Sequence, residues 1–511
     1  MLAKTTTASL LGLQVIKIDV EVDTANGLPS VNIVGLPDTA VKESRDRVRA
    51  AIDNSGLAFP MQRVTINLAP ADSRKEGTHF DLPIALGVLM STGQIAGAAL
   101  DDIVVIGELS LDGSVLRVNG VLPMIMELMR NGYSRVIIPW ENRFEAGMLK
   151  GLQCCFVHNL KDMTQQIHKG IQFVPAESVL THEEPEEQPV ELFHDLQGQE
   201  NVKRALEIAA AGGHNLLMVG PPGSGKTMAA RRLPDILPDM SFDESMEVAV
   251  IYSAAGLLLP DRTFFKRRPF RAPHHTTSTI ALTGGGRIPR PGEISLSHRG
   301  VLFLDELPEF DKRTLEILRQ PLEDGHVIVS RASGSFTFPS EFMLVAALNP
   351  CPCGFYGFEE NGVVCQCAPY QVQRYANRIS GPLLDRMDLF VETRRIAYED
   401  LADKRVTDDP SLIRNNVQRA REIQQSRFRN SGNRTNSQIK PSQIHQHCRL
   451  MASAEKLMKE AFDKMKLSAR AYHRVLKVSR TIADLASSEE IQQHHLAEAL
   501  QFRSLHHFKR S

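Results

Sequence analysis

A short run of glycine, proline, lysine and threonine has the residue types and spacing of a loop that binds phosphate. It reads Gly220, Pro221, Pro222, Gly223, Ser224, Gly225, Lys226 and Thr227, which fits the pattern G-x-x-x-x-G-K-[ST]. An apolar run at 216–219 precedes it and a helix-like segment follows. The pattern predicts that backbone N–H groups and Lys226 hold the phosphates of ATP, and that Thr227 binds Mg²⁺. The alternative is a glycine-rich turn without a ligand.

Polar residues at the ends of two further apolar runs are candidates to complete an ATP site. Val301–Leu304 is followed by Asp305 and Glu306, and the run that begins at Phe342 ends at Asn349. Side chains at the carboxyl ends of parallel strands face the ligand crevice of an α/β sheet. We expect Asp305 to hold Mg²⁺, Glu306 to polarise the attacking water and Asn349 to sense the γ-phosphate. An acidic turn and an asparagine that caps its strand are the alternatives.

This order of motifs resembles that of the AAA+ ATPases, and the resemblance implies two arginine roles. Arg386, in the segment Leu-Leu-Asp-Arg-Met-Asp, is similar to the arginine finger that the helix-2-insert clade, which includes magnesium chelatase, contributes to a neighbouring subunit. Arg470 stands at a helix start that resembles the sensor 2 position of the same clade. Arg378 competes with Arg386, and Arg474 competes with Arg470. For each of these arginines a surface salt bridge is the alternative.

Four of the seven cysteines form two Cys-x-Cys pairs directly after Asn349. Cys351, Cys353, Cys365 and Cys367 have a spacing that permits a tetrahedral thiolate site, so we predict structural Zn²⁺. Reduced free thiols and a redox-active disulfide are the alternatives. The odd number of cysteines argues against the disulfide framework of a secreted protein.

The surrounding elements predict an α/β fold of several domains. Strand-like and helix-like runs alternate in residues 1–170, and residues 171–192 form a linker rich in glutamate and proline. An α/β ATPase core is predicted at 193–398 and a helical C-terminal domain, the lid, at 399–511. A charged segment with an Asp-Pro turn signal, 402–411, marks the weaker of the two breaks.

The long segments 268–310 and 349–389, together with 31–56, resemble the ComM/YifB family of magnesium-chelatase-like AAA+ proteins, and the resemblance extends over essentially the full length. The resemblance implies a hexameric, DNA-dependent ATPase that drives branch migration of DNA during natural transformation. It also implies single-stranded and branched DNA as partners, with recombination proteins as further candidates. The alternative is a chelatase-like or protein-remodelling ATPase that acts on a protein partner.

Local charge favours the DNA motor. Residues 262–299 hold eight basic side chains against one acid, Glu293. We expect this excess near a β-hairpin around 284–292, and a second hairpin at 323–342 with Arg331 near its turn. Basic hairpins that line a pore would contact phosphates without reading sequence. The basic residues are Arg262, Lys266, Arg267, Arg268, Arg271, Arg287, Arg290 and Arg299.

The N-terminal domain resembles the proteolytic domain of Lon, whose catalytic dyad is Ser–Lys. His79 stands where that serine is expected and Leu122 where the lysine is expected. A small shift in alignment would leave Thr78 or Ser73 as candidates, but it supplies no lysine. We therefore predict a Lon-like domain without the dyad, which speaks against an ATP-dependent protease. The pair His274-His275 is expected to be structural and not to bind metal.

Bulk properties narrow the class of protein. The formal net charge is −1, so any positive surface must be local. The N-terminus lacks the pattern of a signal peptide, and no apolar run reaches the roughly 20 residues of a membrane span. These features predict a cytoplasmic protein without a membrane partner.

Overall fold

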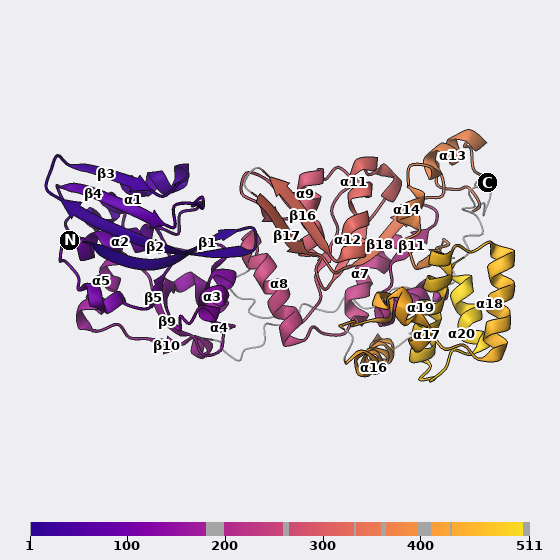
Figure 1. Ribbon diagram of the computed structural model, residues 1–511. Helices are drawn as coiled ribbons and strands as arrows, with labels where there is room; N and C mark the ends of the chain where they lie inside the picture. Colours follow the sequence, from indigo (N-terminus) through magenta and orange to yellow (C-terminus); the bar gives the residue numbers. More distant parts are fainter. Residues whose placement is uncertain are drawn as a thin grey trace.

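The computed structural model describes residues 2–179, 199–258, 265–331, 334–358, 364–395, 410–429 and 432–503. Figure 1 shows an N-terminal α/β body beside a larger one, in which a second sheet is followed by a group of helices at the C-terminal end. Within the described residues, no helix combines the length and the apolar character that crossing a bilayer needs. The α/β class predicted from the sequence is confirmed.

An eight-stranded mixed sheet forms the centre of the N-terminal domain, in the order β10-β9-β8-β5-β1-β2-β4-β3. Helices α1, α2 and α5 cover one face, and α3 and α4 cover the other. Successive side chains of a strand point to opposite faces of the sheet. In β8, Ile137 packs against the face covered by α1, α2 and α5, and Val136 packs against the face covered by α3 and α4. The strands are β1 (Ala3–Leu11), β2 (Gln14–Ala25), β3 (Ser30–Val34), β4 (Arg63–Ala69), β5 (Ile103–Val105), β8 (Arg135–Pro139), β9 (Gln153–Val157) and β10 (Val174–Pro175). The helices are α1 (Thr39–Asn54), α2 (Asp81–Ser91), α3 (Val121–Arg130), α4 (Arg143–Gly147) and α5 (Leu160–Lys169).

This domain extends past the boundary predicted at residue 170. Strand β10 pairs with β9 through Val174 and Cys154, and Ala176 in the following turn is buried. Residues 171–179 therefore belong to the N-terminal domain, and the predicted start of the linker was too early. The rest of the predicted linker lies outside the described residues.

A parallel five-stranded sheet forms the core of the second domain, in the order β12-β15-β18-β11-β19. Strands β11, β15 and β18 are buried along their whole length, as their uninterrupted apolar sequences predict. The strands are β11 (Leu216–Val219), β12 (Phe270–Arg271), β15 (Val301–Leu304), β18 (Met343–Leu348) and β19 (Leu389–Glu392). The helices around them are α6 (Glu200–Gly212), α7 (Lys226–Ile236), α8 (Phe242–Ala255), α9 (Thr279–Thr283), α10 (Glu293–Leu296), α11 (Lys312–Ile317), α12 (Arg319–Asp324), α13 (Pro369–Ala376) and α14 (Gly381–Leu384).

Both predicted hairpins are present. The first joins β13 (Gly284–Gly285) to β14 (Arg290–Pro291), and the second joins β16 (His326–Arg331) to β17 (Gly334–Pro339). We call them the insert hairpin and the second hairpin. The tip of the β1–β2 ribbon reaches the second hairpin, because a Cβ on Gly12 would lie 3.0 Å from Cδ1 of Phe336.

The C-terminal part is helical, as the spacing of its apolar residues predicts. Helices α16 and α19 pack on α6 and share one hydrophobic cluster with the five-stranded sheet. Most of the segment 402–411, where a break was predicted, lies outside the described residues. The helices are α16 (Pro410–Phe428), α17 (Ile444–His447), α18 (Ala452–Met465), α19 (Ala469–Leu485) and α20 (Gln493–Gln501).

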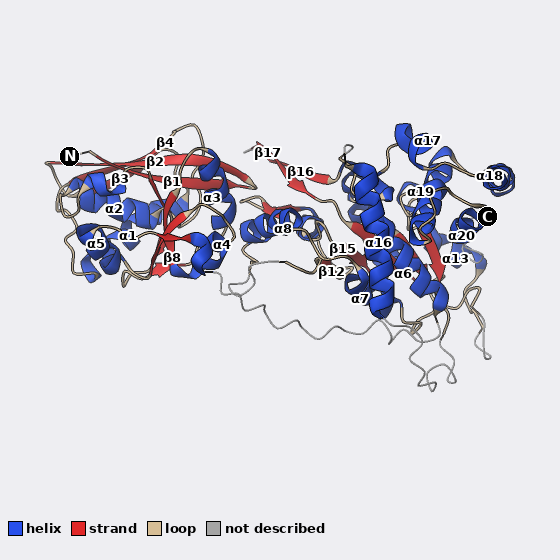
Figure 2. Ribbon diagram, turned by 90° about the horizontal axis from the view of Figure 1, so that it is seen from below, coloured by secondary structure: helices blue, strands red, loops and turns tan. Residues whose placement is uncertain are grey.

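Helix α8 joins the parts of the molecule. Figure 2 shows it between the N-terminal domain and the parallel sheet. Its Met246 and Ala249 belong to the same hydrophobic cluster as α3 and α4, and Ser253 Oγ donates a hydrogen bond of 2.6 Å to the buried Glu145. On its other side, Glu244 of α8 forms an ion pair of 3.2 Å with Arg434, which precedes α17.

Candidate ATP site

The phosphate-binding loop follows β11 at the carboxyl edge of the parallel sheet. Gly223 and Gly225 have φ values of +75° and +80°, a conformation that glycine adopts without strain. Gly220 is required for a different reason, because a Cβ there would lie 2.1 Å from Oγ1 of Thr393. Helix α7 begins at Lys226, so the loop leads directly into a helix N-terminus, where backbone N–H groups favour an anion.

The predicted lysine and asparagine are brought together at this edge. The Nζ atom of Lys226 donates to the carbonyl oxygens of Gly220 and Pro221 at 2.7 and 2.8 Å, and to Oδ1 of Asn349 at 3.2 Å. Burial lowers the pKa of Lys226 to about 8, against the opposing effect of Asp305 and Glu306. The ammonium group is thus held beside the three strand ends from which the other predicted residues come.

The predicted magnesium ligands also meet. Thr227 Oγ1 donates a hydrogen bond of 2.5 Å to Oδ2 of Asp305. A hydroxyl and a carboxylate in contact at the mouth of a phosphate-binding loop are oxygen ligands of the type that Mg²⁺ prefers. These residues fit the ion, and with it bound they would help to neutralise the charge of the β- and γ-phosphates.

Glu306 is positioned by a contact that the sequence reasoning missed. Its backbone has φ of +50°, its side chain is 54% exposed, and its Oε2 lies 3.4 Å from Nδ1 of His275. Strand β12 pairs with β15 through Phe270 and Val301, which carries the following segment to the end of β15. The prediction of a merely structural histidine pair was therefore incomplete, although His274 does hydrogen-bond locally, to Thr276.

The predicted arginine finger and sensor 2 arginine lie together at the opposite edge of the sheet. Arg386 precedes β19, whose Leu389 pairs with Leu216 at the start of β11. Arg386 is buried and forms an ion pair with Glu323, and Arg470 approaches the same carboxylate at 3.5 Å. The four residues of β11 separate this edge from the phosphate-binding loop by about 13 Å. Neither arginine therefore reaches the ATP site of its own chain in this structure.

The two competing arginines have different surroundings. Arg378 Nη1 donates to the carbonyl oxygen of Pro308 at 3.3 Å and forms an ion pair of 2.8 Å with Glu309. Arg474 forms an ion pair with the buried Asp388 and donates to the carbonyl oxygen of Arg386 at 2.9 Å. Burial would raise the pKa of the Asp388 carboxyl, but the Arg474 guanidinium, His214 and Lys477 together hold it well below its usual range. Arg474 thus has a structural partner within its own chain.

The four cysteines converge on one point. Their sulfur atoms all lie within 4.8 Å of one another, and Cys351 Sγ is 3.3 Å from Cys353 Sγ and 3.7 Å from Cys365 Sγ. In a tetrahedral site with Zn–S bonds of about 2.3 Å, neighbouring sulfurs are about 3.8 Å apart. The thiols are not joined as disulfides. The geometry therefore suits a metal of zinc's size and preference for sulfur.

Local hydrogen bonds favour the thiolate form of Cys353, whereas burial raises the pKa of Cys365 and of Cys367. Burial alone would raise the pKa of Cys353, but hydrogen bonds from the Phe355 backbone and from Cys351 lower it to about 6. The cluster also adjoins the phosphate-binding loop, because a Cβ on Gly354 would lie 2.4 Å from Cδ of Pro222. Cysteines that follow the sensor strand are thus packed against the loop that would hold ATP.

The positions compared with the Lon dyad are both buried. His79 Nε2 hydrogen-bonds to the carbonyl oxygen of Ala8 at 2.8 Å, and burial lowers the pKa of the imidazole to about 4. Leu122 packs in the cluster shared with α8. Lys75 donates to the backbone oxygen of Ser73 at 2.7 Å.

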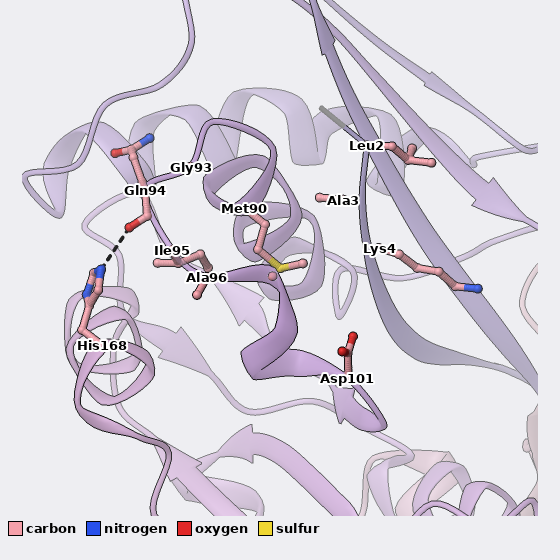
Figure 3. A pocket seen from close by; sticks show the side chains of 11 residues that line it. Leu2, Ala3, Lys4, Met90, Gly93, Gln94, Ile95, Ala96, Asp101 and His168 are labelled. Carbon is pink, nitrogen blue, oxygen red and sulfur yellow. Dashed lines mark hydrogen bonds between the residues drawn. The ribbon is translucent and has the colours of Figure 1, made fainter.

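The N-terminal domain also has a cavity of about 570 Å³. Figure 3 shows that it lies beside β1, with His168 hydrogen-bonded to the carbonyl oxygen of Gln94 at 3.0 Å. Its lining mixes apolar side chains such as Met90 with the charged groups of Lys4 and Asp101. None of the residues predicted to act on ATP lines this cavity.

Comparison with known proteins finds family models that match the segment of the candidate ATP site, and it identifies relatives of the whole chain. The family model "Magnesium chelatase, subunit ChlI" matches residues 192–401, "Subunit ChlI of Mg-chelatase" matches 20–142, and "Magnesium chelatase, subunit ChlI C-terminal" matches 408–503. The match at 192–401 covers the phosphate-binding loop, Asp305, Asn349 and the four cysteines.

Curated relatives match this chain over nearly its whole length. Competence protein ComM of Haemophilus influenzae is 43% identical over 97% of this chain and 96% of its own length. The protein YifB of Escherichia coli is 42% identical over 98% of this chain and 96% of its own. The magnesium-chelatase 38 kDa subunit of Rhodobacter capsulatus is 27% identical over 32% of this chain and 51% of its own. The chain therefore belongs to the ComM/YifB family of magnesium-chelatase-like AAA+ proteins.

Proposed function

We propose that this protein is an ATP-driven motor that moves single-stranded or branched DNA. The observation that carries the proposal is the meeting of Lys226, Thr227, Asp305 and Asn349 at the carboxyl edge of a parallel sheet. This is the arrangement that ATP hydrolysis requires, with a phosphate-binding loop, an acid for Mg²⁺ and a polar sensor. The relative named competence protein ComM supports a role in recombination during natural transformation.

In ATP hydrolysis, each polar residue at the carboxyl edge of the sheet would have a separate role. Lys226 holds the phosphate oxygens, Thr227 and Asp305 hold Mg²⁺, and Asn349 orients the γ-phosphate. Glu306 would take the proton of the attacking water as its oxygen bonds to the γ-phosphorus, while the bond from that phosphorus to the bridging oxygen breaks and ADP leaves with the electron pair. Because Lys226 donates to two carbonyl oxygens and to Asn349 in the structure, binding ATP exchanges some of these acceptors for phosphate oxygens.

The arginines at the opposite edge support an assembly in which each site is shared by two subunits. Arg386 and Arg470 would face the γ-phosphate held by a neighbouring copy, with Arg386 as the finger. Glu323, which contacts both guanidinium groups, would hold them in place until that phosphate arrives. A homo-hexameric ring satisfies this geometry and is the assembly we propose.

The two hairpins are the proposed contacts to DNA. Arg287 and Arg290 belong to the insert hairpin, and Arg331 ends β16 of the second hairpin. All three side chains are exposed. Phosphate contacts of this kind are independent of sequence and weaken as salt is added, which suits a motor that must move along any DNA. Recombination proteins are further proposed partners.

Two structural roles complete the proposal. The four cysteines would bind Zn²⁺ and thereby fix the segment that runs from the sensor Asn349 toward Arg386. The N-terminal domain would be a Lon-like fold without the Ser–Lys dyad that serves the ring as a scaffold. The proposed units are 1–179 for this domain, 193–398 for the ATPase core and 399–511 for the helical lid, in a protein of the cytoplasm.

The decisive test is ATP hydrolysis by the purified protein, with and without single-stranded DNA, at two salt concentrations. We expect strong stimulation by DNA that fades as salt rises, and loss of hydrolysis in Lys226→Ala. Hydrolysis that DNA does not change under any condition would reject the DNA motor in favour of an ATPase that acts on a protein partner. Absence of hydrolysis in the wild type would reject both.

A further inference from the structure

An exposed leucine stands in a strained turn at the end of β3. Leu36 has φ of +56°, a left-handed conformation that is uncommon for residues other than glycine, asparagine and aspartate. Its side chain is nevertheless 57% exposed, so burial in the core of this chain does not explain it. Backbone strain of this kind persists where the surroundings enforce it, and it gathers at functional sites.

The turn is held rigidly. Lys75 N donates to the carbonyl oxygen of Leu36 at 3.2 Å, and Asp38 N donates to the carbonyl oxygen of Lys75 at 3.0 Å. A Cβ on Gly35 would lie 2.3 Å from the carbonyl oxygen of Leu68, so the chain cannot move inward. Pro37 follows and fixes its own φ. The apolar side chain of Leu36 therefore projects from a backbone turn whose position is fixed.

The turn lies beside the basic hairpins. Asp38, two residues after Leu36, has its Oδ2 atom 3.6 Å from Nη2 of Arg287 on the insert hairpin. The second hairpin lies against the insert hairpin, because a Cβ on Gly285 would lie 2.7 Å from Nη2 of Arg331. The Asp38 carboxylate is itself buried, with 1% of the side chain exposed, so it does not present negative charge beside Leu36.

The charge of the two hairpins is only partly compensated. Arg287 pairs with Asp38, whereas the exposed Arg290 and Arg331 have no ion pair with any described residue. Uncompensated guanidinium groups on neighbouring hairpins favour a polyanion over an apolar protein surface. Arginines without an ion-pair partner in the described part of the chain thus lie near a rigid apolar side chain. A nucleic acid would suit this surface, because its phosphates can bind the arginines and its bases can contact the leucine.

We propose that the turn Leu36-Pro37 is a wedge that separates base pairs at the junction of a branched DNA, while the hairpin arginines hold the phosphates. Apolar side chains that enter between base steps partially unstack them and kink the duplex, and at a fork this would favour separation of the next base pair. This inference rests on the proposed DNA motor and adds the element that parts the strands. The motor would pull one DNA strand past the hairpins. Leu36 would enter the gap left between the two strands when each base pair opens.

The test uses Leu36→Asn in the full-length protein. Asparagine tolerates the left-handed conformation, so the turn is kept while the apolar tip is lost. Leu28→Asn is the matched control, because Leu28 is 89% exposed and precedes β3, at the other end of its five residues. The three proteins are compared in ATP hydrolysis stimulated by single-stranded DNA, in unwinding of a forked duplex, and in molecular mass.

We expect Leu36→Asn to keep its DNA-stimulated hydrolysis within about twofold and to lose about tenfold in the rate of fork unwinding, because the polar side chain no longer enters between the base steps. Leu36→Met should unwind at nearly the wild-type rate, and so should Leu28→Asn.

Unwinding by Leu36→Asn at the wild-type rate would overturn the wedge. A fall in molecular mass of that variant would overturn it too, because Leu36 would then serve a contact between subunits. Failure of the underlying motor is distinguishable, because the wild type itself would then show no stimulation by DNA.

Discussion

Removing one sulfur from the four-cysteine cluster tests its role most directly, and we choose Cys353→Ser. Sulfur separations of 3.3 to 3.7 Å match a Zn–S₄ tetrahedron, and a serine hydroxyl in place of one thiolate removes a strong ligand. We expect the wild-type protein to contain about one zinc per chain and the variant much less.

The loss of stability can be worked from the loop that the metal closes. Cys365 lies 14 residues beyond Cys351, and closing a loop of about 15 residues is worth about 3 kcal/mol in chain entropy. A domain of the size of the ATPase part shifts by about 2–4 °C per kcal/mol. The melting temperature of the ATPase domain should therefore fall by about 6–12 °C in Cys353→Ser.

The assay joins elemental analysis to thermal unfolding. Each protein is measured as purified, after treatment with a zinc-selective chelator, and after zinc is restored. Cys155→Ala is the control, because Cys155 is buried in the N-terminal domain, away from the cluster, and its removal should leave the zinc content unchanged. A wild-type protein that is folded, hydrolyses ATP and contains no zinc would refute the reasoning.

Three further changes probe the ATP site itself. Glu306→Gln should bind ATP with wild-type affinity and turn it over at least about 100-fold more slowly, since removing a general base typically costs 10²–10⁴-fold; rapid turnover would disprove its assignment. His275→Ala should raise the basal hydrolysis rate by up to about fivefold without changing nucleotide affinity, because loss of the 3.4 Å contact, worth about 0.2–1 kcal/mol for an exposed pair, makes the Glu306 carboxylate more basic; His274→Ala is the control, and equal rates in both would contradict the contact. Because burial lowers the pKa of Lys226 to about 8, the ammonium form is lost as pH rises through 8, so the ATP dissociation constant should rise by up to about tenfold per pH unit above it; a constant affinity from pH 7 to pH 10, measured by titration with a fluorescent nucleotide, would count against the buried lysine.

The sequence predicted those parts of the site in which the residues that bind the ligand also determine the local backbone structure. The phosphate-binding loop needs glycines at fixed positions and a lysine at the helix start, so its motif specifies both geometry and function. Asp305 and Asn349 could be predicted because an uninterrupted apolar run ends at each, and parallel strands bring such ends to one edge. The cysteine cluster could be predicted from spacing alone.

Contacts set by sheet pairing could not be predicted in this way. Strand β12 has two residues, too few for a recognisable pattern, yet it places His275 beside Glu306. Likewise, the sharing of Glu323 by Arg386 and Arg470 depends on how α12 meets the C-terminal helices. The domain boundary was misjudged because β10 is short and contains proline, which resembles a linker.

The position of α8 affects how stable the two halves of the molecule are when they are produced separately. By sequence this helix belongs to the ATPase half, but its Met246 and Ala249, with Leu258 just after it, complete a hydrophobic cluster built mainly from the N-terminal half. In addition, Glu145 accepts a hydrogen bond from Ser253 of α8. Expressed alone, either half would expose apolar surface and the N-terminal half would lose a partner for a buried carboxylate. We therefore expect the two halves, produced as separate chains, to reassemble into one complex in which each half melts at a higher temperature than it does alone.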